Sequence, residues 1–162
     1  MKDIRIRISL FKQRLYLLKE AKVLAEYSVS TAKNGPGELY GSGCTPRGLH
    51  QVNAMIGANA ELNTVFVGRF PSGEIYTPIL AARYPQRDWI LTRILWLAGL
   101  EPDWNLFGDR DTLRRYIYIH GCPAELPLGV PLSHGCIRMA NEAIIELFEQ
   151  VKVGDKVLIV DA

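Results

Sequence analysis

The chain opens with a regular alternation of hydrophobic and polar residues. Ile4, Ile6 and Ile8 fall on one face of an extended segment, and the arginines between them fall on the other. An alternation with a period of two is typical of a β-strand that is buried on one side only. We therefore predict a half-buried strand over residues 4–10.

Two further apolar segments follow closely, over residues 13–18 and 23–30. Strands so close in sequence pair as antiparallel neighbours, so we expect a three-stranded meander. A stretch rich in glycine and proline, residues 33–48, is expected to form a loop with specific turns. Further short strands are predicted over residues 51–56, 64–68, 115–120 and 157–160.

Two segments carry apolar residues at the spacing of an amphipathic helix. The first is expected over residues 88–98, with Asp88 as its N-cap and Gly99 as its C-terminal stop. The second is predicted over residues 141–151, with Asn141 as its N-cap. The remaining elements are strands, so we predict a mainly β fold with one inserted helix and one C-terminal helix.

The predicted elements belong to one domain. A chain of 162 residues matches a single domain with its own hydrophobic core. No internal repeat, low-complexity segment or linker interrupts the sequence. A β-sandwich or a twisted mixed sheet buries strands of this kind, and we predict one such domain over residues 1–162.

Composition and charge narrow the class of partner. The formal net charge is only +2 and no dense basic run is present, so a nucleic-acid partner is not expected. No apolar run has the length of a membrane span, and no secretory signal precedes the first strand. We therefore expect a cytoplasmic protein without a membrane partner. Its three cysteines are an odd number, which argues against a disulfide framework.

A cysteine framed by two histidines is the clearest chemical feature. His134 precedes Cys136 by two residues, and His120 ends the strand before it. A cysteine reacts as a thiolate, so an imidazole that accepts its proton makes it a candidate nucleophile. Gly135 allows a tight turn with exposed N–H groups that could hold the oxyanion of an acyl transfer. Gly121 leaves room beside the His120 ring, and its carbonyl could fix the tautomer.

The order of these motifs resembles the catalytic signature of the L,D-transpeptidases, the YkuD-type domain. That signature has a His-Gly pair, here His120-Gly121, then Ser-His-Gly-Cys-(apolar)-Arg-Met, here residues 133–139, and then a helix with an early Asn. The resemblance covers almost the whole chain, because it extends to Gln13-Arg14-Leu15-Tyr16, Thr45-Pro46-Arg47-Gly48 and Gly154-Asp155-Lys156-Val157.

The resemblance implies a cysteine enzyme that acts on peptidoglycan peptides without a cofactor or a metal. Cys136 would attack the carbonyl of the L-centre of diaminopimelate in a tetrapeptide stem and release D-Ala. His120 would take the thiol proton, oriented by the Gly121 carbonyl. Backbone groups of His134, Gly135 and Cys136 would line the oxyanion site. Water or an amine would then resolve the thioester.

The choice between these two acceptors gives two functional alternatives. In a chain without a leader we expect hydrolysis to the tripeptide, an L,D-carboxypeptidase reaction in cytoplasmic cell-wall recycling. The alternative is an L,D-transpeptidase that forms cross-links or exchanges D-amino acids. The resemblance also implies acylation of Cys136 by carbapenems.

Other interpretations of these residues stay open at this point. Cys136 could be a buried thiol, His120 a core histidine, and His134 a residue that only shapes the loop. Ser133 is expected to hydrogen-bond the turn rather than react. A zinc site would recruit Cys122 as well, although the spacing lacks a C-x-x-C or H-x-x-x-H pair. A non-catalytic peptidoglycan-binding module is the other rival class.

Residues 83–115 depart from the shorter members of the family. We expect an insertion there that forms a lid or wall over the peptide groove. The substrate carries at least two carboxylates, for which arginine is a natural partner. Arg138 is the first candidate because it lies two residues from Cys136, and the further candidates are Arg83, Arg114 and Arg115. Two cysteines, Cys44 and Cys122, have no assigned role, although Cys122 stands where Thr is common.

Overall fold

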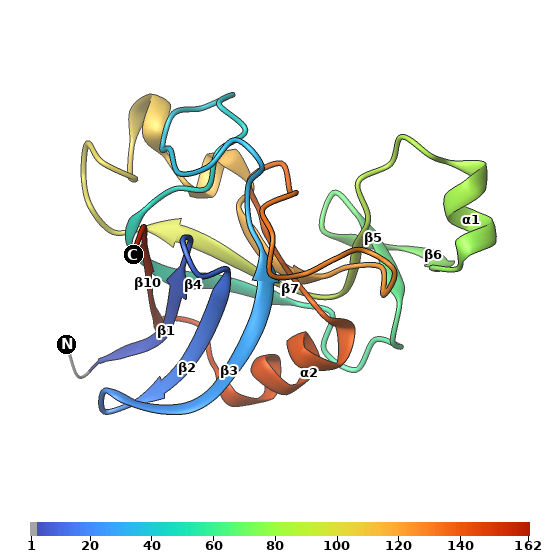
Figure 1. Ribbon diagram of the computed structural model, residues 1–162, viewed down its shortest axis with the longest axis horizontal. Helices are drawn as coiled ribbons and strands as arrows, with labels where there is room; N and C mark the ends of the chain where they lie inside the picture. Colours follow the sequence, from blue (N-terminus) through green and yellow to red (C-terminus); the bar gives the residue numbers. More distant parts are fainter. Residues whose placement is uncertain (1–2) are drawn as a thin grey trace.

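A ten-stranded β-sheet organises the computed structural model, which describes residues 3–162 (Figure 1). Its strands are β1 (Ile4–Ser9), β2 (Arg14–Lys19), β3 (Lys22–Ser30), β4 (Gly48–Ile56), β5 (Thr64–Val67), β6 (Phe70–Ile75), β7 (Ile90–Gly99), β8 (Tyr118–Gly121), β9 (Ile137–Met139) and β10 (Lys156–Val160). The helices within these residues are α1 (Pro78–Arg83), α2 (Asn141–Gln150) and two short 3-10 turns, η1 (Gly108–Arg110) and η2 (Leu113–Arg115).

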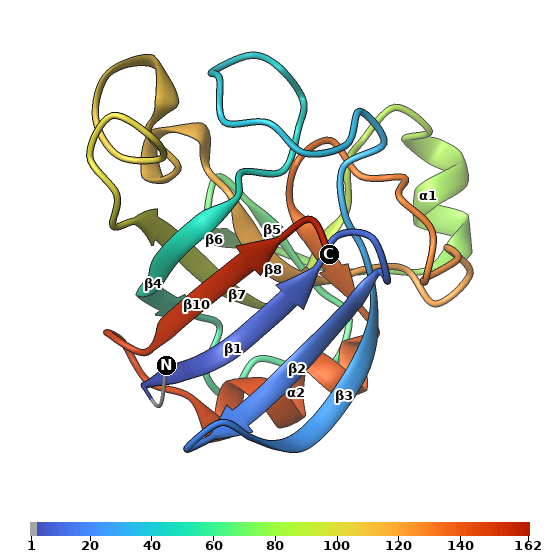
Figure 2. The ribbon, with the colours of Figure 1, turned by 60° about the vertical axis from the view of Figure 1, so that its left-hand side comes forward.

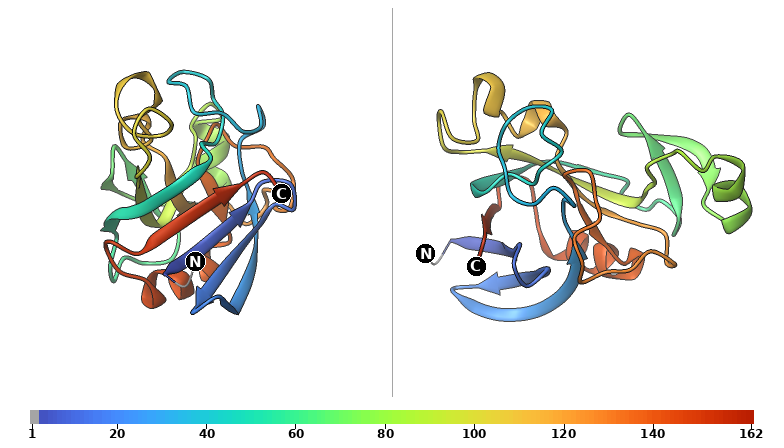
Figure 3. Two further views of the ribbon diagram at one scale, coloured as in Figure 1. Left: turned by 90° about the vertical axis from the view of Figure 1, so that its left-hand side faces the viewer. Right: turned by 45° about the horizontal axis from the view of Figure 1, so that its top comes forward.

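Pairing between β4 and β7 closes eight of the strands into a ring. The strand order is β4-β10-β1-β2-β3-β9-β8-β7-β5-β6, so the β5–β6 hairpin continues from β7 outside the ring. The pairs β1–β10 and β8–β9 are parallel, while the meander β1–β2–β3 is antiparallel, so the sheet is mixed. Figure 2 shows β10, β1, β2 and β3 side by side, and Figure 3 shows the hairpin and α1 far from them. The predicted mainly β fold is confirmed.

The main hydrophobic core draws on every strand of the ring and on α2. Burying each large aliphatic side chain stabilises the fold by about 1.5–3 kcal/mol, so this cluster is the main source of stability. α2 contributes its buried face, which is why a helix follows β9 directly. Members of the cluster include Ile6, Ile8, Leu15, Val29, Val52, Leu95, Leu97, Ile119, Ile137, Met139, Ile144, Leu147 and Ile159.

The predicted C-terminal helix is present, but its start differs from the prediction. α2 covers Asn141–Gln150, and its N-cap is Ala140, which makes no side-chain capping bond. The Asn141 side chain is buried instead: it accepts a hydrogen bond from the Thr92 hydroxyl at 2.7 Å and donates to the Cys122 carbonyl at 2.9 Å. Asn141 therefore ties α2 to the strands beneath it.

The helix predicted over residues 88–98 is wrong, because Ile90–Gly99 form strand β7 in the middle of the sheet. Eight of its ten residues are buried. A strand buried on both faces reads as a continuous apolar run, which periodicity does not separate from a buried helix. A bulge between Leu91 and Ile94, where Thr92 takes a φ of 76°, also breaks the alternation of the strand.

The position of β7 also corrects the expected insertion. Because β7 pairs with β4, β5 and β8, residues 90–99 belong to the main sheet and not to a lid. The strand predicted over residues 115–120 begins later, at Tyr118, since residues 113–115 turn as η2 and Tyr116 takes a left-handed φ of 56°. Within residues 3–162, no helix combines the length and the apolar character that crossing a membrane requires.

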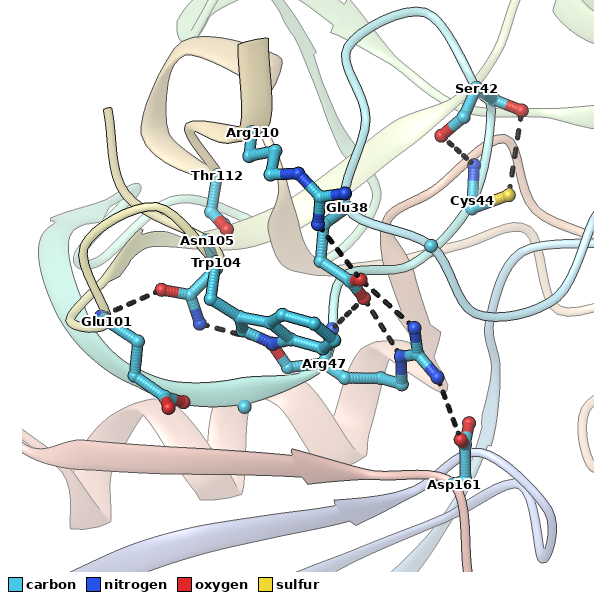
Figure 4. Close-up of polar contacts among 12 residues, drawn as sticks. Glu38, Ser42, Cys44, Arg47, Glu101, Trp104, Asn105, Arg110, Thr112 and Asp161 are labelled. Atoms are coloured by element: carbon cyan, nitrogen blue, oxygen red, sulfur yellow. Dashed lines mark hydrogen bonds and ion pairs between the residues drawn. The ribbon is translucent and has the colours of Figure 1, made fainter. Parts of the chain in front are cut away.

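The predicted Gly- and Pro-rich loop is fixed by a group of polar side chains, termed the loop-anchoring cluster (Figure 4). Glu38 is buried and accepts hydrogen bonds from Arg47 Nε at 2.9 Å and Nη2 at 3.0 Å. Arg47 Nη1 also binds Asp161 at 3.0 Å, which joins the loop to the end of the chain. The cluster consists of Glu38, Arg47, His50, Asn105, Thr112 and Asp161.

Candidate active site

Adjacent parallel strands bring Cys136 and His120 to one face of the sheet. In the β8–β9 pair, Ile119 lies opposite Ile137 and His120 opposite Arg138. The two isoleucines point into the core, so the side chains that alternate with them point the other way. We term this side the Cys136 face; it carries Tyr118, His120, Cys136 and Arg138.

His120 is held in one tautomer by the residue that follows it. The imidazole is 1% exposed, and its Nδ1 lies 2.6 Å from the Gly121 carbonyl oxygen. A carbonyl only accepts hydrogen bonds, so the hydrogen is on Nδ1 and Nε2 carries the free lone pair. Burial lowers the pKa of His120, which keeps the ring neutral at neutral pH. Among residues 3–162, Nε2 has no hydrogen-bond partner.

The thiol of Cys136 is half-buried, and the residue directly precedes β9. Its Sγ lies 3.3 Å from the Tyr118 N–H, which donates to it, and 3.4 Å from the Tyr116 carbonyl, which accepts from it. Burial raises the pKa of the thiol to about 12, and the negative charge of Asp88 acts in the same direction. The resting group is therefore a neutral thiol that is bonded to the backbone of Tyr116 and Tyr118 rather than to His120.

The turn before Cys136 is shaped by Ser133. The Ser133 hydroxyl donates to the Cys136 carbonyl at 2.6 Å and accepts from the Gly135 N–H at 3.2 Å. This is the turn-forming role that the sequence predicted for Ser133. Gly135 takes a φ of 133°, and a Cβ there would lie 3.2 Å from the Cys44 carbonyl oxygen, so a side chain would be strained. The N–H groups of His134 and Cys136 carry no hydrogen bond among residues 3–162.

Gly121 is required by its packing against β7 and α2. A Cβ at this position would lie 2.6 Å from the Leu91 carbonyl oxygen and would also contact Asn141 Oδ1. The close approach of β7 and α2 is thus a further reason for glycine here, besides the predicted room for the His120 ring. Because Gly121 supplies the carbonyl that orients His120, this packing also fixes the ring.

Arg138 and His134 share a carboxylate that the sequence analysis had assigned to a helix cap. Asp88 accepts from Arg138 Nη2 at 3.1 Å and lies 3.5 Å from His134 Nδ1. Burial favours the neutral acid, but His120, Arg138 and His134 together lower the pKa of Asp88. Asp88 thus keeps a negative charge beside the Cys136 face. Its position was missed because the residues after it were predicted as a helix.

The other candidate arginines have different surroundings. Arg115 donates to the carbonyls of Gly37 and Cys44 at 3.1 and 2.5 Å, so its guanidinium holds the Gly-rich loop. Arg114 is exposed beside the same loop. Arg83 is exposed at the end of α1 and is not among the residues that line the clefts around Cys136.

The exposed His134 side chain lines more than one cleft. One, of about 480 Å³, contains Cys136 and is walled by Arg69, Tyr116 and Tyr118. Another, of about 460 Å³, is lined by Trp89, Leu126 and Arg138 together with His134. The backbone of Tyr116 and Tyr118 touches the thiol, a role that the sequence did not reveal because both residues read as ordinary strand positions.

The remaining cysteines lie outside the clefts. Cys122 is buried, and burial raises its pKa to about 11, which makes it a poor nucleophile. The Cys44 thiol is half-buried and contacts the carbonyls of Asn34 and Ser42 at 3.6 and 3.7 Å. Within residues 3–162, no three His, Cys, Asp or Glu side chains are arranged as ligands for a metal ion.

The chain is similar in sequence to proteins of a known family. The sequence model of the YkuD family, the L,D-transpeptidase catalytic domain, matches residues 3–159. A probable L,D-transpeptidase of Escherichia coli K12, YbiS, is 47% identical over 109 residues, which are 65% of this chain and 35% of YbiS. This chain spans two fifths or less of the first curated relatives that it matches.

Solved structures of low sequence identity share the fold. The crystal structure of an L,D-transpeptidase from Xylanimonas cellulosilytica aligns with a TM-score of 0.61 and 19% identity, over 96% of this chain and 59% of that one. The Enterococcus faecium L,D-transpeptidase aligns with a TM-score of 0.59 and 19% identity, over 99% of this chain and 50% of that one. At this identity the match supports the fold alone.

Proposed function

Since the chain belongs to the YkuD family of L,D-transpeptidase catalytic domains, we propose that Cys136 is the nucleophile of an acyl transfer on peptidoglycan peptides. One observation carries this proposal: His120 lies on the Cys136 face with Nδ1 bound to the Gly121 carbonyl and Nε2 free to accept a proton. A nucleophile, a base and a group that orients the base are the parts that covalent catalysis requires.

The resting pair is neutral, so proton transfer accompanies the attack. The high pKa of Cys136 keeps the thiol protonated, and burial keeps His120 uncharged. Sγ must leave the Tyr116 carbonyl and turn toward the carbonyl carbon of the substrate, while Nε2 takes its proton. Hydrogen bonds at catalytic groups are often loose before substrate binds, so the resting contacts agree with this sequence of events.

The proposed substrate is a stem tetrapeptide that ends in diaminopimelate and D-Ala. Sγ forms a bond to the carbonyl carbon at the L-centre of diaminopimelate, and the bond from that carbon to the D-Ala nitrogen breaks. The proton held by His120 passes to the departing amine, which leaves a thioester on Cys136. The unpaired N–H groups of His134 and Cys136 are the candidate donors to the oxyanion, since the Gly135 N–H is already bonded to Ser133.

We propose water as the acceptor of the acyl group, which makes the reaction an L,D-carboxypeptidase reaction. Although Cys136 is half-buried, it lines a cleft at the surface, so water reaches the thioester without any further element of the protein. His120 would take a proton from the water, and the products are the tripeptide and the free thiol.

Transfer to an amine is the second candidate, and the cleft beyond His134 favours it. That cleft is separate from the one that contains Cys136 and is lined by Trp89, Leu126 and Arg138. A second groove next to the thioester gives an acceptor peptide a place to bind. The product would then be a cross-linked peptide or a peptide with an exchanged D-amino acid.

Product analysis distinguishes the two acceptors. The purified protein is incubated with disaccharide-tetrapeptide, with and without D-Met, and the products are separated by mass. Tripeptide as the main product supports hydrolysis, and a dominant D-Met product supports transfer to an amine. Cys136→Ala abolishes both products and prevents a mass adduct with a carbapenem, whereas the control Cys44→Ala leaves both intact. Full turnover by Cys136→Ala would show that another residue is the nucleophile.

A further inference from the structure

Two of the arginines that the sequence pointed to, Arg138 and Arg115, are engaged by other groups of the protein, and the other two, Arg83 and Arg114, are exposed and do not line the cleft that contains Cys136. Arg138 is bound to Asp88 and donates to the Leu132 carbonyl at 3.4 Å, and Arg115 is bound to loop carbonyls. A different arginine, Arg69, lines the same cleft as Cys136. We infer that Arg69 is the residue that binds a carboxylate of the peptide substrate next to the thiol. This inference rests on the proposed function and names a recognition contact for it.

Arg69 is held in place by several aromatic side chains. Its guanidinium lies over the ring of Trp96 at 4.9 Å and the ring of Tyr116 at 4.8 Å from the centroids. Its Nη1 donates to the Tyr118 hydroxyl at 3.1 Å, and Trp96 is itself fixed by a 3.1 Å bond from Nε1 to the Leu113 carbonyl. Such contacts orient a guanidinium without neutralising its charge.

The same aromatic residues connect Arg69 to the nucleophile. The Tyr116 carbonyl and the Tyr118 N–H are the two groups in contact with Cys136 Sγ, at 3.4 and 3.3 Å. Their side chains hold Arg69, so the cation and the thiol are supported by the same two residues of one backbone segment. A carboxylate bound by Arg69 would therefore lie close to the carbonyl that Sγ attacks.

Within the described part of the chain, no ion pair neutralises the charge of Arg69. No carboxylate among residues 3–162 forms an ion pair with it, whereas Arg87 is paired with Glu74 at 2.8 Å. Arg69 is half-buried, and its Nε and Nη2 have no hydrogen-bond partner among residues 3–162, so its guanidinium presents a fork that matches a carboxylate. The cleft thus contains a cation that is positioned and available.

The β5–β6 turn sets where the Arg69 side chain leaves the backbone. Gly68 and Arg69 are the two central residues of the β5–β6 hairpin turn, and both have positive φ values, 56° and 69°. Turns of this kind favour Gly or Asn at both positions, and a larger residue there is strained. The turn nevertheless places an arginine where it reaches the cleft.

The stem tetrapeptide offers two carboxylates near the bond that breaks. One is the α-carboxylate of the terminal D-Ala, and the other is at the D-centre of diaminopimelate. Either supplies the planar anion that Arg69 would bind, and two amidated analogues distinguish them. One analogue ends in D-alaninamide, and the other carries a carboxamide at the D-centre.

The test measures D-Ala or D-alaninamide release by the wild type, Arg69→Gln, Arg69→Lys and the control Arg7→Gln. Arg7 also stacks on an aromatic ring, that of Tyr16 at 4.9 Å, but it is exposed on β1. For the tetrapeptide, KM rises about tenfold or more in Arg69→Gln with kcat nearly unchanged, which is the signature of lost uniform binding. Arg69→Lys retains part of the affinity because it keeps the charge, and Arg7→Gln behaves as the wild type.

The analogues identify the carboxylate and can overturn the inference. Amidation of the bound carboxylate removes the difference in KM between the wild type and Arg69→Gln, whereas amidation of the other carboxylate preserves it. A wild-type protein that releases no D-Ala would reject the proposed function and this inference with it. An active wild type with an unchanged KM in Arg69→Gln rejects the inference alone, as does an equal rise in KM for all three substrates.

Discussion

The loop-anchoring cluster and the Cys136 face contain the same kinds of side chain, but they use them differently. Each contains a buried histidine whose Nδ1 is bonded to a backbone carbonyl, Gly48 for His50 and Gly121 for His120. In His50 the second nitrogen accepts from the Thr112 hydroxyl at 3.0 Å, whereas Nε2 of His120 has no partner among residues 3–162. The bonding capacity of one ring is exhausted, and that of the other is not.

The arginines repeat this contrast. Arg47 in the loop-anchoring cluster is paired with Glu38 and Asp161, and these carboxylates raise its pKa. Arg69 next to the Cys136 face stacks on aromatic rings and has no such carboxylate within the described part of the chain. Polar groups that are fully paired contribute to stability, and groups held in place with capacity to spare are available to a substrate. The difference separates structural from functional residues better than residue type does.

The largest expected effect comes from the same substitution in the two histidines. His120→Gln removes the proposed base, so kcat/KM falls by roughly 10² to 10⁴, while the thermal midpoint changes little. His50→Gln breaks the bond network around Thr112 and lowers the free energy of unfolding by roughly 1–3 kcal/mol, while kcat/KM of the folded enzyme is retained. Steady-state kinetics measure kcat/KM of both variants, and urea denaturation measures their free energy of unfolding. Equal loss of activity in the two variants would remove the distinction.

A second prediction uses the pH dependence of stability. Burial lowers the pKa of His50 to about 4, whereas the unfolded chain binds this proton near pH 6.5. The stabilisation is therefore complete above pH 6.5 and is lost as the pH falls toward 4, and for His50 it amounts to about 3 kcal/mol. The lowered pKa of His120 acts in the same direction.

Urea denaturation at pH 7, 5.5 and 4.5 measures this loss. In His50→Gln the free energy of unfolding falls less between pH 7 and 4.5 than in the wild type, because His50 no longer takes up a proton on unfolding. In His120→Gln the fall is smaller for the same reason. Glu38 contributes little to this loss at pH 5.5. Burial favours its neutral form, but hydrogen bonds from Arg47 hold its pKa below the usual 4.5, so its stabilisation begins to be lost only near pH 4.5 and mostly in stronger acid. Stability that stays constant from pH 7 to 4.5 contradicts the prediction.

Local sequence patterns predicted the parts of the fold that depend on neighbouring residues. The alternation at residues 4–10 gave β1, and the helical period after Asn141 gave α2. β7 was missed because burial on both faces and the bulge at Thr92 erase its alternation. The motif identified Cys136 and His120 as candidates, since the family signature is local in sequence.

The partners of these residues could not be predicted in the same way. Asp88 meets Arg138 across 50 positions of the chain, and Arg69 meets Tyr118 across 49. His50 meets Thr112 across 62. Such pairs depend on the closure of the ring and on the register of β7 against β4, β5 and β8. The sequence alone therefore indicates which groups are reactive, and only the fold shows which of them are already paired.

The smallest expected effect concerns Glu38. We expect its ion pair with Arg47 to contribute to stability and not to activity. Glu38→Gln keeps the shape of the side chain but removes its charge, so the hydrogen bonds from Arg47 weaken while the buried oxygen still accepts. The free energy of unfolding falls by about 1–2 kcal/mol, because Arg47 is about one-third exposed and retains Asp161 as a partner. Urea denaturation at pH 7 measures the change.

Activity of the same variant gives the sharper result. Glu38 lies in the loop-anchoring cluster, and the loop is also held from the other side by Arg115 through Gly37 and Cys44. The loop therefore keeps its position, and kcat/KM of the folded Glu38→Gln protein stays near that of the wild type. Asp161→Asn serves as the matched control, since Asp161 is the exposed partner of Arg47 and its loss costs less stability. If kcat/KM fell by more than the fraction of Glu38→Gln protein that is unfolded, the cluster would position the Cys136 face as well as the loop.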